Sequence, residues 1–152
     1  FIDSSADALK AVEKNLELNN FDAQKCEIYH EKVFVALEKL ALDHKQFDIV
    51  VLDPPAFVKS KKDLFAGLRG YEKLVKLAVP LLRENGVLFL ASCSHNVSLS
   101  DLAEAASQGL RKGLLGQKRQ AKLVRSFGAG FDHPLHPNLK ESEYLKSVAF
   151  VV

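Results

Sequence analysis

A short apolar run over residues 47–52 ends in an acid that two prolines follow at once, Asp53-Pro54-Pro55. The run is short, rich in β-branched residues and bounded by turn residues, which is typical of a buried strand. Prolines fix the path of the chain out of such a strand and remove backbone donors. The sequence therefore predicts that the Asp53 carboxylate is held at the edge where parallel sheets bind ligands.

A second apolar run, residues 87–91, ends in Ser92-Cys93-Ser94-His95. If the two strands are parallel neighbours, an acid and a thiol face one crevice. A thiolate at Cys93 can act as a nucleophile, although a free cysteine is often only a small buried hydrophobe. His95 lies two residues further on and shares the face of Cys93 if the chain stays extended. This pairing predicts an enzyme.

Apolar runs alternate with helical patterns along the whole chain. We expect helices at residues 6–19, 33–42, 71–83 and from 98 to about 109 or 115, and strands at 26–30, 47–52, 87–91, 122–127 and 148–152. Cys26 falls in the first of these strands and is interpreted as core, and residues 58–70 are expected to form a polar loop. The alternation predicts βα units and a mostly parallel sheet. The last two strands have no helix between them, which favours an antiparallel hairpin.

Length and composition indicate one globular domain over residues 1–152, because the 152 residues are 47% hydrophobic and 26% charged. No apolar run approaches the length of a membrane span or resembles a signal peptide, so no membrane partner is expected. Two cysteines and no His/Cys cluster at ligand spacing argue for a reducing cytoplasm and against a zinc site. A net charge of +2 does not by itself indicate a nucleic-acid partner.

The stretch from residue 105 to 131 is basic and contains no acid. Its basic residues are Arg111, Lys112, Lys118, Arg119, Lys122 and Arg125. Together with the lysines after Phe57, which are Lys59, Lys61 and Lys62, they could form a phosphate-binding face. A charge run is more often a solvated surface, so the sequence leaves both interpretations open.

Asp3 also ends an apolar segment and precedes a small-residue turn, Ser4-Ser5, into a helix. In α/β nucleotide-binding folds an acid at this place suits hydrogen bonds to a ribose. A helix-capping aspartate is an equally good interpretation.

Four ordered motifs carry a resemblance to a known family. They are Asp53-Pro54-Pro55-Ala56-Phe57, Ser92-Cys93-Ser94-His95, Asp132-His133-Pro134 and Glu143-Tyr144-Leu145-Lys146. Over essentially its whole length the chain resembles the class I S-adenosylmethionine-dependent methyltransferases that make 5-methylcytosine in 23S ribosomal RNA. The resemblance implies a Rossmann-like α/β sheet with an antiparallel C-terminal hairpin, S-adenosyl-L-methionine (SAM) as cofactor and ribosomal RNA as substrate.

The resemblance also implies roles for individual residues. Cys93 would be the catalytic nucleophile, adding to C6 of the target cytosine, and Asp53 would be a catalytic acid near the cofactor amine and the base. Phe57 would stack on the base. The expected cofactor-binding residues are Asp3, Ser4, Asp53 and Pro54, and the expected substrate-binding residues are Pro55, Phe57, Lys59, Arg69 and His95.

Two departures from the family pattern qualify these expectations. The family has a Gly-rich first strand and an RNA-binding region upstream of Asp3, so the sheet is expected to lack its first strand. Where the family offers an acid near the adenine, this chain has Lys32 beside Glu31. We therefore expect the isolated chain to be inactive, with the open sheet closed by upstream residues, by a rearranged strand or by a partner chain such as a second copy.

Two alternatives remain beside the methyltransferase. One is a non-catalytic RNA-binding or assembly module that keeps the fold without a competent cofactor site. The other is a nicotinamide-dependent dehydrogenase, whose Gly-x-Gly-x-x-Gly would lie upstream and which leaves Cys93 without a role.

Overall fold

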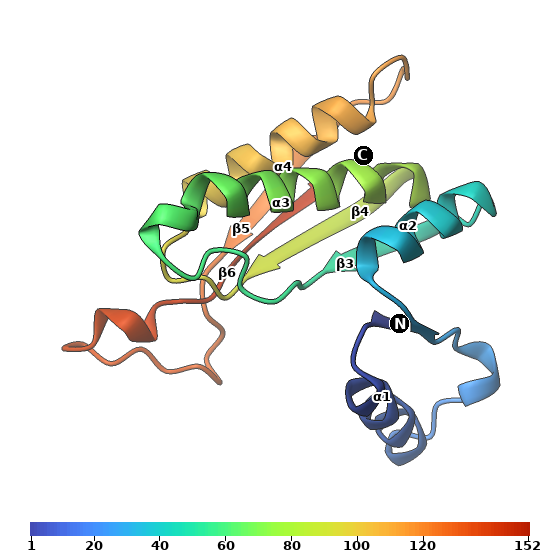
Figure 1. The fold of residues 1–152 in the computed structure, drawn as a ribbon, viewed down its shortest axis with the longest axis horizontal. Coiled ribbons are helices and arrows are strands. Elements are labelled where there is room, and N and C mark those ends of the chain that lie inside the picture. Colours follow the sequence, from blue (N-terminus) through green and yellow to red (C-terminus); the bar gives the residue numbers. More distant parts are fainter. The chain divides into compact units, whose positions relative to one another are not determined.

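The computed structural model describes residues 1–152, apart from the side chain of Lys140. The chain forms two compact units, residues 1–45 and residues 46–152 (Figure 1). None of the helices in the described part of the chain is long and apolar enough to cross a membrane.

The first unit is a small α/β arrangement. Its elements are β1 (Ile2–Asp3), α1 (Ala6–Leu18), β2 (Tyr29–His30) and α2 (Val33–Leu42). The strands β1 and β2 pair in parallel. Ser5 caps α1 by accepting a hydrogen bond from the Ala8 amide at 3.2 Å, as a serine N-cap does. Leu9 and Leu16, seven residues apart on one face of α1, are buried.

The second unit is a four-stranded sheet with two helices. Its elements are β3 (Phe47–Leu52), α3 (Leu64–Ala78), β4 (Leu82–Ser92), α4 (Leu99–Gly113), β5 (Lys122–Phe127) and β6 (Lys146–Val151). The strand order is β3-β4-β6-β5, with β3 parallel to β4 and with β6 antiparallel to both β4 and β5. The predicted α/β class, the parallel pairing and the antiparallel C-terminal hairpin are confirmed.

The segment around α3 corrects three sequence-based expectations. The expected loop at residues 58–70 is partly helical, because α3 begins at Leu64 after a 3-10 turn at Lys61–Asp63. The α-helix ends at Ala78, and Pro80 lies in the 3-10 turn that follows, where a missing backbone donor costs little. β4 begins at Leu82, five residues before the expected strand at 87–91, so Asn85-Gly86 lies inside it. Asn85 has a φ of 63° near a register shift between β3 and β4.

The predicted strand at residues 26–30 is also shorter than expected. Cys26 follows a 3-10 turn, Ala23–Lys25, and lies outside β2. Its side chain is half-buried, so the interpretation of Cys26 as a core residue in mid-strand is wrong. Only Tyr29 and His30 make the strand, because β1 offers just two partner residues.

One face of the four-stranded sheet carries the core of the second unit. The helices α3 and α4 lie side by side over this face (Figure 1), and Leu88, Leu90, Val148 and Phe150 are buried beneath them. The helices pack closely at Gly109, where a Cβ atom would lie 2.5 Å from the Glu72 carbonyl oxygen. This close packing fixes α3 against α4.

The opposite face of the same sheet is open within the second unit. Ile49 and Val51 are 63% and 62% exposed. The expected buried strand is therefore exposed on this face, and on its other face Val50 is half-buried and Leu52 is buried. Along its outer edge, β3 has no partner strand among the described residues. Ile49 and Val51 are exposed because α3 and α4 cover only one side of the sheet. The continuous apolar sequence of β3 is typical of a strand in a sheet that is covered on both sides.

Candidate functional site

Asp53 and Cys93 come to the same edge of the second unit's sheet. The parallel strands β3 and β4 pair in a register that puts Leu52 beside Leu90, so Asp53 and Cys93 follow the carboxyl ends of adjacent strands. Extension of this register separates their Cα atoms by roughly 8 Å, from a strand spacing of about 4.8 Å and a rise of about 3.3 Å per residue. The predicted adjacency of the two strands is confirmed.

The two residues differ in environment from their immediate neighbours. Asp53 is exposed between buried Leu52 and buried Pro54, and Cys93 is half-buried between two buried serines. This alternation is that of an extended chain, whose successive side chains point to opposite faces. Within the described residues the Asp53 carboxylate makes no hydrogen bond or ion pair, so it is free to accept one from a ligand.

Buried hydroxyl groups hold the backbone on both sides of Cys93. The hydroxyl of Tyr71, on α3, lies 2.8 Å from Ser92 Oγ and 3.2 Å from Ser94 Oγ. Ser92 Oγ also accepts a hydrogen bond from the Ser94 amide at 3.2 Å. All three side chains are buried. Since buried polar groups are costly unless they are paired, this network favours one conformation of the loop that presents Cys93.

The same network reaches the loop that follows Asp53. The Val58 amide donates to Ser94 Oγ at 3.4 Å, and the Phe57 ring packs on the Tyr71 ring with centroids 4.8 Å apart. At Gly70 on α3, a Cβ atom would lie 2.9 Å from the Phe57 ring. Phe57 is therefore half-buried against α3. Its predicted stacking on a base stays a prediction.

Lys146, the first residue of β6, adds a buried cation below the Cys93 loop. It pairs with Ser92 across β4 and β6, and its Nζ donates to the Ser94 carbonyl at 2.8 Å and to the Val97 carbonyl at 2.6 Å. Burial lowers the pKa of Lys146, while attraction to Glu143 and Cys93 acts in the opposite direction.

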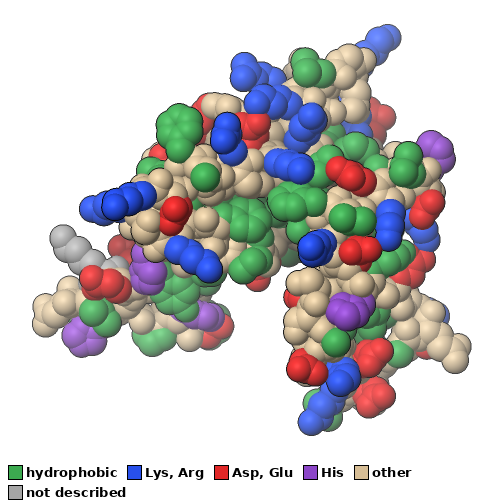
Figure 2. Space-filling view, viewed as in Figure 1, with side chains coloured by type: hydrophobic (Ala, Val, Ile, Leu, Met, Phe, Trp, Pro, Cys, Tyr) green, Lys and Arg blue, Asp and Glu red, His purple; other side chains and the backbone are tan. Residues whose placement is uncertain are grey.

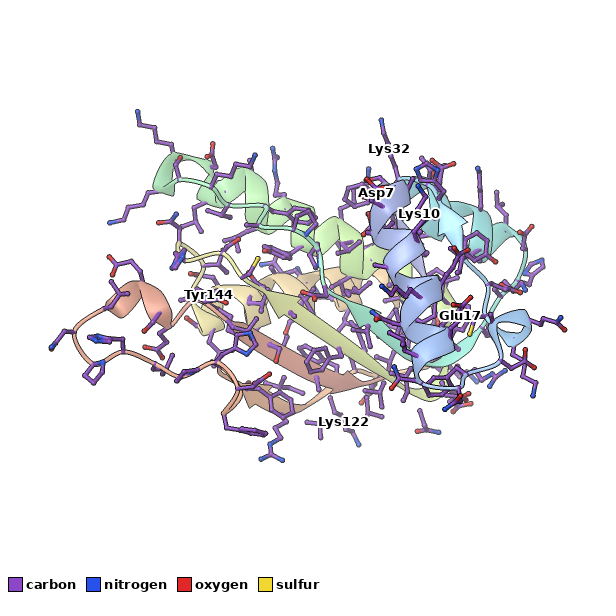
Figure 3. The ribbon with its side chains drawn as sticks, turned by 90° about the horizontal axis from the view of Figure 1, so that it is seen from below. Asp7, Lys10, Glu17, Lys32, Lys122 and Tyr144 are labelled. Atoms are coloured by element: carbon purple, nitrogen blue, oxygen red, sulfur yellow. The ribbon has the colours of Figure 1, made fainter. Side chains whose placement is uncertain are left out.

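His95 and Tyr144 form an aromatic pair beside this loop. Their ring centroids are 5.5 Å apart with planes tilted by 48°, and His95 is exposed. Tyr144, labelled in Figure 3, lies just before β6. The chain after β5 therefore returns beside the loop that follows β4.

The predicted substrate-binding residues lie on the second unit. Pro55 and Lys59 are exposed in the loop after β3, and Arg69 is exposed on α3. Basic side chains gather over α3 and α4 on the face seen in Figure 2.

Two of the basic residues between 105 and 131 make polar contacts with the α3–β4 region. Lys112 pairs with Glu72 at 2.5 Å, and Arg119 donates to the Leu82 carbonyl at 2.9 Å. Both contacts join α4, or the segment after it, to the α3–β4 region. These two residues therefore support the packing of the unit, whatever else they contact.

Asp3 and Ser4 belong to the first unit, and Asp53 and Cys93 belong to the second. Asp3 Oδ1 accepts a hydrogen bond from the Ser5 amide at 2.8 Å, and the Ser4 carbonyl oxygen lies 3.0 Å from His30 Nε2. Asp3 thus orders the turn before α1, but Ser5 is the helix cap.

The acid beside Lys32 is already engaged within the first unit. Glu31 Oε2 accepts from Lys39 Nζ at 2.9 Å, and Lys39 is the main reason that the pKa of Glu31 is below its usual value. Lys32 itself is exposed at the start of α2 (Figure 3). Glu31 therefore points along α2, toward Lys39.

Sequence reasoning gave no role to Tyr71, Ser92, Ser94, Tyr144 or Lys146. Ser92, Ser94, Tyr144 and Lys146 belong to the motifs of the sequence analysis, and a lysine at the start of an apolar strand could have indicated a buried amine. Tyr71 could not have been found, because it lies 21 residues before Ser92. Among the described residues, no group of three His, Cys, Asp or Glu side chains could hold a metal ion.

Solved structures share this fold. A Streptococcus mutans protein described as a SAM-dependent methyltransferase is 22% identical to the chain and has a TM-score of 0.78, over 99% of this chain and 37% of that one. NSun6 from Pyrococcus horikoshii, solved with SFG, is 18% identical and has a TM-score of 0.63, over 99% of this chain and 40% of that one. The fold is therefore the α/β methyltransferase fold.

Sequence comparison identifies the family. Ribosomal RNA large subunit methyltransferase I of Escherichia coli strain SMS-3-5 is 34% identical over 148 residues, which are 97% of this chain and 36% of that protein. The homologue from Klebsiella pneumoniae strain 342 matches to the same extent. The chain thus spans about a third of the length of these relatives. The family model described as "Conserved hypothetical protein 95" matches residues 1–118, and the chain belongs to that family.

Proposed function

We propose that the complete protein is a cytoplasmic SAM-dependent methyltransferase that modifies cytosine C5 in large-subunit ribosomal RNA. The observation that carries the proposal is that Asp53 and Cys93 follow the ends of adjacent parallel strands. The Asp53 carboxylate is open to a ligand, and the backbone on both sides of Cys93 is held by hydrogen bonds of Tyr71 with Ser92 and Ser94. The relatives are named ribosomal RNA large subunit methyltransferase I, which supports the reaction and the substrate class.

The roles of the protein groups follow from the chemistry of cytosine. C5 is a poor nucleophile until the Cys93 thiolate adds to C6, which places electron density on C5. SAM would supply there a methyl group on an electrophilic sulfonium, and its transfer to C5 would break the sulfur–methyl bond and leave S-adenosylhomocysteine. The C5 proton then passes to solvent as the bond between C6 and sulfur breaks, which restores the aromatic ring and the free thiolate.

The residues present fit a cofactor of this kind. Asp3 has one carboxylate oxygen engaged with the Ser5 amide, and its other oxygen can accept from a ribose hydroxyl. Asp53 is an exposed, unpaired acceptor that suits an amine. Asp3, Ser4, Asp53 and Pro54 would hold SAM.

RNA contact is proposed for the surface around α3. Lys59 and Arg69 are exposed, and Arg69 precedes Gly70, which packs directly against Phe57. Phosphates bound there would lie beside the loop that follows Asp53. Pro55, Phe57 and His95 would then contact the extruded base, since a base must leave its stack to reach a nucleophile.

The test is the Cys93→Ala variant of the complete protein. Methyl transfer to ribosomal RNA should be abolished while SAM affinity, measured by calorimetry, stays within about twofold of wild type. Cys26→Ala is the matched control, because Cys26 is the other half-buried cysteine of the chain and has no proposed role. Residual activity of Cys93→Ala within about tenfold of wild type, a barrier change near 1.4 kcal/mol, would show that Cys93 is not the nucleophile.

A second candidate function is a non-catalytic RNA-binding or assembly module. The observation in its favour is the engagement of Glu31 with Lys39 beside an exposed Lys32, which leaves this part of the cofactor surface without a free acid. Calorimetry on the complete protein separates the two. Measurable SAM binding supports the enzyme, and RNA binding without SAM binding supports the module. A homodimer would be detected by light scattering in the same preparation.

A further inference from the structure

We propose that Lys146 is a positioning residue for the reaction at Cys93, holding the loop at residues 93–97 to strand β6. The inference rests on the proposed function for its catalytic meaning. Lys146 is not among the catalytic, cofactor-binding or substrate-binding residues expected from the sequence.

The first observation is where the amine lies. Lys146 is only 8% exposed, and a lysine is rarely buried to this extent unless its amine is paired. It lies opposite Ser92 in the antiparallel ladder, one residue before Cys93. A long stem that starts there carries the amine beneath the turn that follows the strand.

The second observation is what the amine binds. The amine donates to two backbone carbonyls of the Cys93 loop, those of Ser94 and Val97. They bracket a turn that is also closed by the hydrogen bond from the Val97 amide to the Ser94 carbonyl at 3.2 Å. Two N–H groups satisfy these acceptors, so the neutral amine and the ammonium can both hold the loop.

The third observation is that the hydroxyl network does not reach this part of the loop. Tyr71, Ser92 and Ser94 fix the backbone at residues 92–94 through side-chain oxygens. Lys146 joins the Ser94 and Val97 carbonyls to the neighbouring strand β6. Without Lys146, the Val97 carbonyl loses its side-chain donor and the Ser94 carbonyl keeps only the Val97 amide, so the loop can relax away from the thiol position.

The experiment uses the complete protein with Lys146→Met, which keeps the apolar stem and removes the donors. We expect kcat for methyl transfer to fall at least tenfold, with the KM for RNA and the SAM affinity within about twofold of wild type. Amide hydrogen exchange should rise at residues 94–97 and stay unchanged in β3 and α1. Lys14→Met, an exposed lysine on α1, is the matched control and should match wild type in both measurements.

Lys146→Arg tests the same idea with the donors retained. It should recover part of the lost kcat relative to Lys146→Met and lower the exchange at residues 94–97. If Lys146→Met does not fold, the arginine variant and its exchange pattern still decide. Equal loss in both folded variants, or exchange that rises throughout the second unit, would overturn the positioning role in favour of general stabilisation.

The outcomes also separate this inference from the proposed function. A wild-type protein that methylates no RNA, combined with exchange that rises only at residues 94–97 in Lys146→Met, would overturn the proposed function and keep the loop role. Normal methyl transfer by Lys146→Met with unchanged exchange would overturn the loop role and keep the function.

Discussion

The buried hydroxyl of Tyr71 is expected to stabilise the protein at the scale of a single residue. Tyr71→Phe keeps the ring that packs on Phe57 but leaves Ser92 Oγ and Ser94 Oγ without this partner. Buried groups that lose a partner cost about 1–3 kcal/mol, so the free energy of unfolding should fall by that amount in denaturant titrations of the complete protein. Tyr144→Phe is the control, since Tyr144 is half-buried and keeps its ring contact with His95. Equal stability of wild type and Tyr71→Phe would contradict a stabilising role of the hydrogen bonds of Tyr71 with Ser92 and Ser94.

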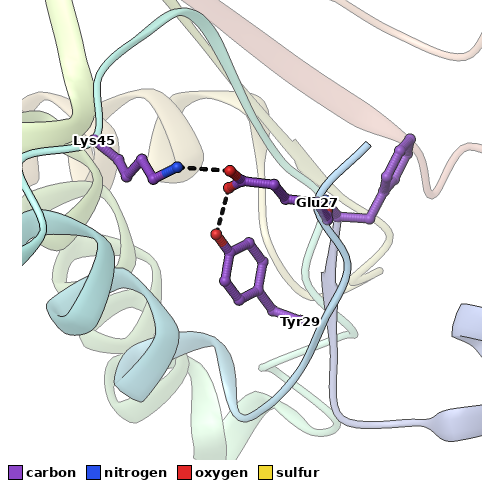
Figure 4. A network of polar contacts seen from close by, with 4 residues as sticks. Glu27, Tyr29 and Lys45 are labelled. Carbon is purple, nitrogen blue, oxygen red and sulfur yellow. Dashed lines mark hydrogen bonds and ion pairs between the residues drawn. The ribbon is translucent and has the colours of Figure 1, made fainter. Parts of the chain in front are cut away.

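Glu27 forms an ion pair within the first unit. Its carboxylate accepts from Lys45 Nζ at 2.6 Å and from the Tyr29 hydroxyl (Figure 4). The hydrogen bond from Lys45 is the largest reason that the pKa of Glu27 is below its ordinary 4.5, and the same bond raises the pKa of Lys45 above 10.5. A lowered acid pKa contributes stability above the unfolded value, and this stability is lost as the pH falls through the folded value.

The corresponding variant is Lys45→Met. Removing the cation should raise the pKa of Glu27, as measured by carbon-13 NMR of its carboxyl group. Lys25→Met, whose partner is Asp22, should leave the titration of Glu27 unchanged. Because the pair is exposed, the effect on total stability should be small. A Glu27 titration that is identical in Lys45→Met and wild type would rule out the ion pair in solution.

At the scale of elements, the contact between α3 and α4 depends on glycine. A Cβ atom at Gly109 would lie 2.5 Å from the Glu72 carbonyl oxygen and 2.8 Å from Val75 Cβ. Alanine gains up to about 1 kcal/mol of helix propensity over glycine, but overpacking against a backbone atom costs about 1–3 kcal/mol. We therefore expect Gly109→Ala to lower the melting temperature of the complete protein. Gly128→Ala, with no neighbour within 4 Å of its Cβ position, should not.

The same contact has a consequence for the site, since α3 carries Tyr71 and packs on the loop after Asp53. A shift of α3 that accommodates alanine at Gly109 should therefore reduce methyl transfer by the folded variant more than Gly128→Ala does. Unchanged activity in a folded Gly109→Ala protein would show that the contacts of Tyr71 with Ser92 and Ser94 tolerate a movement of α3.

At the scale of the whole molecule, the open sheet predicts self-association of the isolated 152-residue chain. β3 exposes Ile49 and Val51, and no described strand pairs with its outer edge. Apolar edge strands template pairing between chains, and a charged side chain opposes it. Light scattering should show oligomers, and Val51→Lys should reduce their mass. Leu18→Lys, which changes an exposed leucine on α1, should have little effect. A well-folded monomer with micromolar SAM affinity would contradict this expectation.

The elements of this chain were largely predictable, because they depend on neighbours in sequence. The capping box of Ser98 and Asp101 starts α4 where the pattern indicated, and Ser5 lies at the expected start of α1. The limits of α3 were not predictable. Gly67 and Gly70 resemble loop residues, yet in the helix they face Val58 and Phe57, where side chains would collide. Contacts with distant residues override glycine's weak helix propensity there.

By itself the sequence determined the fold class, the two strand ends at Asp53 and Cys93, and the polar character of that edge of the sheet. These features depend on hydrophobic periodicity and on turn residues, which are local properties of the chain. Only the tertiary structure decided which groups surround Cys93. Tyr71 reaches Ser92 across 21 residues of chain, and Lys146 reaches Ser94 across 52. Such pairings depend on the order of strands β4 and β6 and on the packing of α3, and a buried hydroxyl or amine is tolerated only where that packing supplies its partner.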